Sequence, residues 1–92
     1  MDAWTNIHYR DFYDVPRMIV ATGPDGTFLF WSRFDEKLDE YVDRYEVWRM
    51  PKIADDELRG SWIGLEARAL ERMPNIALSE LPFAVERYSA SR

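Results

Sequence analysis

Only a few side chains in the sequence have the chemistry of a catalytic group. Histidine is the side chain that titrates nearest to neutral pH, and the chain has one, His8. A histidine that acts as a general base needs a nucleophile and an orienting acid beside it. No serine lies in the G-x-S-x-G pattern of a nucleophile elbow, since Gly60 and Gly64 flank Ser61 at a different spacing. We therefore expect His8 to be a half-exposed residue on an edge strand.

The residues that bind metal ions or phosphate groups do not form a known pattern. The chain has no cysteine, and one histidine cannot provide the paired imidazoles of a zinc motif. The acidic segment 35–43 carries carboxylates that suit Ca²⁺ or Mg²⁺, but it lacks the central glycine of the calcium loop. Gly23-Pro24-Asp25-Gly26 is too short for a phosphate loop, and Asp25 would repel phosphate. We expect no metal ion and no cofactor.

Aromatic residues are the better candidates for a functional surface, because they make up 15% of the chain. Tryptophan and arginine are the residues most enriched at the hot spots of protein interfaces. We predict a partner-binding surface of Trp31, Arg33, Trp48 and Arg49, which neighbouring strands would bring together. The competing interpretation is that the four tryptophans only fill the core of a small domain.

The charge of the chain narrows the choice of partner. Seventeen acidic residues against twelve basic ones give a net charge of −5, which a nucleic-acid backbone repels. Nucleic-acid binding would need Arg10, Arg17, Arg33 and Arg49 on one face. The acidic segments 35–46 and 55–57 instead suit a basic protein partner through electrostatic steering.

A hairpin is the clearest structural signal. Gly23-Pro24-Asp25-Gly26 has the residue types of a tight turn between 18–22 and 27–34, two segments rich in β-branched or aromatic residues. If Thr22 faces Thr27, alternation places Ile19, Ala21, Phe28 and Phe30 on one face, and Met18, Val20, Leu29 and Trp31 on the other. Both faces are apolar, which predicts a central hairpin covered on both sides.

The remaining segments predict a further set of short elements. Residues 44–50 alternate as a third strand, and 7–12 form a plausible edge strand. Residues 35–43 fit a short helix or a charged loop equally well, and Asp55 or Asp56 suits the cap of one helical turn. Residues 65–73 fit either a helix or a strand. A turn, a short strand and one tight helical turn follow at 74–82, and a last strand is expected at 83–88.

Together these elements predict one globular domain over residues 1–92, mainly β or β-rich α+β. The favoured architecture is a small, partly open SH3-like or OB-like barrel, or an antiparallel meander of four to six strands with one or two helical turns. The alternative is an antiparallel sheet with a helix at 65–73. No signal peptide is apparent, and the longest apolar runs are far shorter than the roughly 20 residues of a membrane span, so we expect a soluble cytoplasmic protein.

Three functions remain open from the sequence. The favoured one is a non-enzymatic protein-interaction module, which would be an adaptor, an inhibitor, an immunity-type protein or a homo-oligomer. The second is a small hydrolase-like enzyme that uses carboxylates with His8, which predicts a pocket gathering at least two of His8, Asp11, Asp14 and Arg17. The third is a nucleic-acid-binding small barrel.

Overall fold

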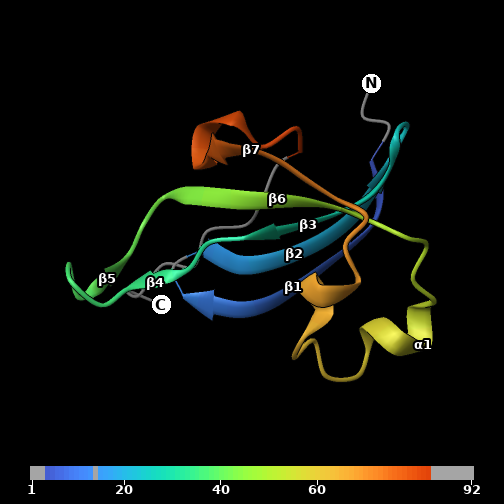
Figure 1. Cartoon of the computed structure of the whole chain (residues 1–92), viewed down its shortest axis with the longest axis horizontal. Coiled ribbons are helices and arrows are strands. Elements are labelled where there is room, and N and C mark those ends of the chain that lie inside the picture. The colour runs from blue at the N-terminus through green and yellow to red at the C-terminus, as the bar shows by residue number, and fades with distance from the viewer. Residues whose placement is uncertain (1–3, 14, 84–92) are drawn as a thin grey trace, which may run out of the picture.

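A five-stranded antiparallel sheet forms the centre of the computed structural model, which describes residues 4–13 and 15–83. The strand order is β1 (Thr5–Tyr13), β2 (Val15–Gly23), β3 (Gly26–Trp31), β6 (Arg44–Met50) and β7 (Glu71–Ala77), as Figure 1 shows. The predicted mainly antiparallel β fold is confirmed. The sheet stays open over the described residues, with β1 and β7 at its edges, so a closed barrel does not form.

The predicted hairpin is confirmed down to its register. Thr22 pairs with Thr27, and the four pairs that follow end at Met18 and Trp31. Gly26 has a φ of 127°, a backbone angle that side chains rarely tolerate, so glycine is needed where the turn enters β3. This hairpin supplies the two central strands on which both sides of the molecule pack.

Each side of the sheet carries its own apolar cluster, as the alternation of β2 and β3 predicts. The first side, which we call the η1 face, buries Met18, Val20, Leu29 and Met50 beneath Ile53, Leu58, Trp62 and Leu65. The second side, the Phe30 face, buries Ile19, Ala21, Phe30, Tyr45, Val47 and Phe83. The hairpin is therefore covered on both sides, as the sequence indicates.

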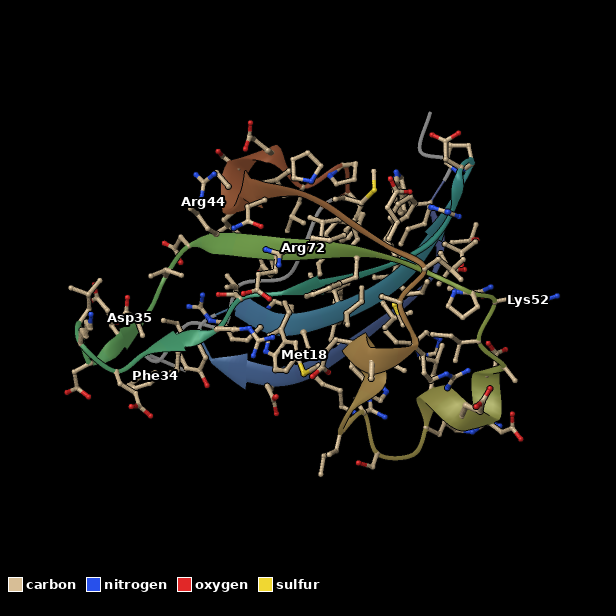
Figure 2. All side chains as sticks on the ribbon, in the orientation of Figure 1. Met18, Phe34, Asp35, Arg44, Lys52 and Arg72 are labelled. Atoms are coloured by element: carbon tan, nitrogen blue, oxygen red, sulfur yellow. The ribbon has the colours of Figure 1, made fainter. Side chains whose placement is uncertain are left out.

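The cover of the η1 face comes from a single stretch of chain after β6. This stretch contains α1 (Asp55–Leu58) and the 3₁₀ helix η1 (Leu65–Arg68), and Figure 1 shows both lying to one side of the sheet. Met18, labelled in Figure 2, belongs to the same apolar cluster as Leu65 of η1. The predicted helical turn near Asp55 is present, but its N-cap residue is Ala54 rather than Asp55 or Asp56.

Two ambiguous segments take forms that the sequence did not predict. Residues 35–43 form neither a helix nor a plain loop, because β4 (Phe34–Asp35) pairs with β5 (Glu40–Tyr41) in a second, two-stranded sheet. Residues 65–73 are neither one helix nor one strand, since η1 ends before β7 begins at Glu71. A helix at 65–73 is therefore wrong.

The last part of the described chain follows the prediction more closely. The expected short strand falls within β7, and the expected tight helical turn is η2 (Leu78–Glu80). The turn expected at Pro74 is wrong, because β7 continues through Pro74 to Ala77. The predicted last strand, 83–88, lies outside the described residues except for Phe83. No helix in the described part of the chain is long and apolar enough to cross a membrane.

Candidate functional site

Three of the four residues predicted to bind a partner lie on the η1 face. Trp31 at the end of β3 and Trp48 of β6 pack partly buried against the apolar cluster there. The Arg33 guanidinium lies 3.7 Å from the ring centre of Trp31, and its Nε donates to Glu46 Oε1 at 2.9 Å. Trp31, Arg33 and Trp48 therefore share one side of the sheet, as β3 and β6 are neighbours.

Arg49 lies on the opposite side of the sheet. It is next to Trp48 in β6, and successive side chains of a strand point to opposite faces. Its register partner in β3 is Phe28, which packs against the Phe30 face, and its Nε lies 3.2 Å from Glu71 Oε1. The structure thus divides the predicted four-residue surface, and Arg49 does not join the other three.

A pocket of about 480 Å³ opens on the η1 face beside Trp31. It lies between the residues of β1, β2 and β3 and the loop that joins α1 to η1. Gly64 has a φ of 77°, which allows the sharp bend that begins η1. The pocket is lined by Arg10, Asp11, Met18, Trp31, Gly60, Ser61, Trp62, Ile63, Gly64 and Glu66.

Arg10 connects β1 to the loop between α1 and η1 that lines this pocket. Its guanidinium lies 4.6 Å from the ring centre of Trp62 and donates to the carbonyl oxygens of Leu58 and, at 3.3 Å, Gly60. Trp62 is buried, and its Nε1 donates to the same Leu58 carbonyl at 3.0 Å. These contacts hold the loop at a fixed position over the sheet.

Glu66 gives the pocket an unused hydrogen-bond acceptor. Its Oε1 is buried and has no hydrogen-bond partner in the described part of the chain. An unsatisfied buried polar atom costs about 1–3 kcal/mol, and most such atoms in proteins do find a partner. Glu66 forms no ion pair with the other described residues, and its side chain lines the pocket.

Ile63 forms the rim of the pocket and is 96% exposed. Its backbone N–H donates to Ser61 Oγ at 3.1 Å, which closes a local turn at the base of the side chain. The sequence patterns did not point to Trp62, Ile63 and Glu66 as candidate site residues. The available signal was an apolar pair, Trp62-Ile63, placed between two glycines in a loop.

The described residues of the enzyme interpretation do not gather in this pocket. The interpretation requires at least two of four residues: Asp11 lines the pocket, His8 and Arg17 do not, and Asp14 lies outside the described residues. His8 is a half-buried residue on the edge strand β1, as predicted. No group of three or more acidic or histidine side chains in the described ranges is arranged to hold a metal ion.

The arginines of the nucleic-acid interpretation are also dispersed. Arg10 and Arg33 lie on the η1 face, Arg49 lies on the opposite side, and Arg17 is buried with only 4% of its surface exposed. They do not form the single basic face that this interpretation requires.

A comparison with known protein families, curated proteins and solved structures gave no match for this chain. Its function must therefore be argued from the geometry of the pocket and its rim.

Proposed function

We propose that this protein is a non-enzymatic protein-interaction module that docks a basic partner on the η1 face. The observation that carries the proposal is the position of Ile63. This large apolar side chain is 96% exposed at the rim of a pocket that Trp31 and Trp62 line. Exposed apolar surface marks an interaction site where it is continuous with aromatic side chains, and tryptophan is enriched at interface hot spots.

The environment of Ile63 supports this role. The loop that carries it is anchored by Arg10 and Trp62, so little conformational entropy is lost when a partner covers the rim. Trp31 lines the same pocket and Arg33 contacts its ring, and both residue types are frequent at interface hot spots. The surface therefore combines a pre-positioned apolar tip with aromatic and arginine contacts.

The charge of the protein supports a basic partner. The chain carries a net charge of −5, and the exposed acids of α1, Asp55, Asp56 and Glu57, directly precede the loop of the pocket. Complementary charge around an interface raises the rate of association and disfavours acidic partners. A basic protein would be attracted to this side of the molecule before any apolar contact forms.

The proposal is tested by replacing Ile63 and comparing it with a second exposed apolar residue. We expect I63S to lose a protein that the wild type captures from extracts of its native cells, and to bind that purified protein roughly tenfold more weakly in calorimetry. L38S is the matched control, because Leu38 is 58% exposed but lies between β4 and β5. Both variants should keep the unfolding temperature of the wild type.

Two results would contradict the proposal. One is equal binding of the purified partner by the wild type and I63S. The other is a loss of binding in L38S as large as that in I63S, since this would place the interface elsewhere.

A further inference from the structure

We infer that the pocket beside Ile63 binds the guanidinium group of an arginine side chain from the partner, with Glu66 as its acceptor. This inference rests on the proposed function, because it names the chemical group that the docking surface would recognise. Four features carry it: the aromatic walls, the free carboxylate oxygen, the balance of charge and the size of the cavity.

The aromatic walls already contact guanidinium groups of this chain. Arg33 lies 3.7 Å from the ring centre of Trp31, and Arg10 lies 4.6 Å from that of Trp62. Tryptophan is the best aromatic partner for a cation, and the planar guanidinium also stacks on the ring. Each indole has two faces, and Trp31, which is only partly buried, lines the pocket while Arg33 contacts it.

Glu66 supplies a directional hydrogen-bond acceptor, which the aromatic rings do not provide. Its buried Oε1 lacks a donor among the described residues, and a guanidinium presents five N–H donors in a planar fork. A carboxylate that pairs with such a fork forms shorter and stronger hydrogen bonds than a neutral acceptor does. An incoming arginine would therefore satisfy a buried side-chain oxygen of a pocket residue that has no partner in the described part of the chain.

The charges that line the pocket favour a cation in spite of Arg10. Asp11 and Glu66 are both acidic, and Arg10 is the single basic side chain of the lining. The guanidinium of Arg10 donates to the carbonyl oxygens of Tyr9, Leu58 and Gly60, which offset part of its charge. Neither carboxylate is paired with Arg10 in the described part of the chain, so both remain able to attract a second cation.

The size of the cavity suits a single long side chain. Its volume of about 480 Å³ lies in the lower half of the range typical of ligand pockets, roughly 300–1,000 Å³. Met18 and Trp31 provide apolar contact for the methylene groups of an arginine, while Glu66 meets its charged end.

The inference is tested with small probes of matched shape. We expect N-acetyl-arginine methylamide to shift the indole N–H signals of Trp31 and Trp62 in a saturable way, with a dissociation constant in the millimolar range. N-acetyl-citrulline methylamide has nearly the same shape without the charge and should cause no saturable shift. The intact chain is used throughout.

Variants identify the acceptor in the same experiment. E66Q keeps the volume of the side chain and removes its charge, so we expect it to weaken binding of the arginine probe roughly tenfold. E36Q removes one exposed charge far along the chain, between β4 and β5, and should change the dissociation constant by less than about twofold. The unfolding temperature of each variant shows that the fold is retained.

The inference is overturned if citrulline binds as well as arginine, if E66Q binds the arginine probe as the wild type does, or if neither indole signal shifts. Its failure is distinct from failure of the proposed function. Loss of partner binding in I63S with no response to the arginine probe removes this inference and leaves the docking surface. A response to arginine that depends on Glu66, with partner binding unaffected by I63S, supports the arginine site and removes the proposed docking surface.

Discussion

Arg17 shows how one charged residue is accommodated inside this small protein. It is 4% exposed, and its Nη1 donates to Ser32 Oγ at 3.1 Å and to Asp43 Oδ1 at 3.3 Å. The guanidinium also lies 4.7 Å from the ring centre of Tyr41. A buried charge is tolerated only where acceptors surround it, so these contacts account for the burial of Arg17.

Two substitutions distinguish how much the buried partner and the exposed partner of Arg17 contribute to stability. Ser32 is 0% exposed, and its hydroxyl accepts from Arg17 and donates to the Val42 carbonyl at 2.6 Å. We expect S32A to lower the free energy of unfolding by about 1–3 kcal/mol, because it removes two hydrogen bonds from the buried side of this network. D43N should cost less than about 1 kcal/mol, since the Asp43 side chain is 64% exposed. Urea denaturation measures both, and the reverse order would disprove this account.

At the scale of elements, the sequence predicts best where local and distant contacts agree. The hairpin of β2 and β3 has turn residues, strand residues and apolar alternation that all favour one register, and that register forms. Residues 65–73 have strong helical propensity, but the Leu70 N–H donates to the Arg49 carbonyl at 2.7 Å and starts the pairing with β6. Sheet pairing therefore ends η1 after one turn, and local propensity could not reveal this.

The β4–β5 hairpin was also not predicted from the sequence, because it depends on pairing that the local pattern does not show. The spacing of Leu38, Tyr41 and Val42 is compatible with a helix, and Asp35 Oδ1 accepts from the backbone N–H groups of Lys37 and Leu38, as the N-cap of a helix does. Phe34 and Tyr41 then meet across the turn, with their ring centres 5.2 Å apart. Asp39 has a φ of 55°, so the right-handed turn stops there and the chain returns to pair with β4. The spacing of the apolar residues could not reveal this pairing.

Gly23 provides a test of close packing at the end of β2. A Cβ at this position would lie 2.8 Å from the ring of Trp4, which itself packs against Phe28 and Phe83 at 5.8 and 5.3 Å. We expect G23A to destabilise the protein by about 1–3 kcal/mol and to change the near-ultraviolet circular dichroism of the aromatic cluster.

Gly60 is the control for Gly23. A Cβ there would have the Glu57 carbonyl at 3.5 Å as its nearest neighbour, which is ordinary contact. We expect G60A to change the free energy of unfolding by less than about 0.5 kcal/mol. Thermal unfolding compares the two, and an equal loss of stability in both would show that the approach of Trp4 to β2 is not what requires glycine at position 23.

The candidate site could be predicted only in part, because some of its residues lie in a connection that distant parts of the chain hold in place. Trp31 and Arg33 follow from residue type, and strand alternation could have separated Trp48 from Arg49. Ile63 and Glu66 belong to a connection whose path over the sheet depends on contacts far along the chain. Arg10 and the Leu58 carbonyl, which fix that path, are 48 positions apart, and no local pattern links them.

At the scale of the whole molecule, the two sides of the sheet depend on different parts of the chain. The Phe30 face is closed by residues near both ends of the described chain, including Trp4 and Phe83, whereas the η1 face is closed by the single stretch 53–69. The same stretch carries the pocket and its rim. The stability of the η1 face and the proposed binding function are therefore coupled through one connection.

Trp62 and Ile63 are adjacent in this connection and make opposite contributions to it. Trp62 is 6% exposed, packs in the apolar cluster and donates to the Leu58 carbonyl, while Ile63 is 96% exposed. We expect W62F to lower the free energy of unfolding by about 1–3 kcal/mol through the lost hydrogen bond and volume. I63S should lower it by less than about 0.5 kcal/mol.

Hydrogen exchange shows whether the loss of stability in W62F is confined to residues 53–69, which cover the η1 face. In W62F we expect faster exchange of the Leu65 and Ala67 amides, which donate to Trp62 and Gly64, than in the wild type. The pairs between β2 and β3 should keep their relative protection, because they are also held by the Phe30 face. Uniform loss of protection across the sheet would mean that the cover and the sheet unfold as one unit, and that partner binding cannot be adjusted through this connection without changing the stability of the whole domain.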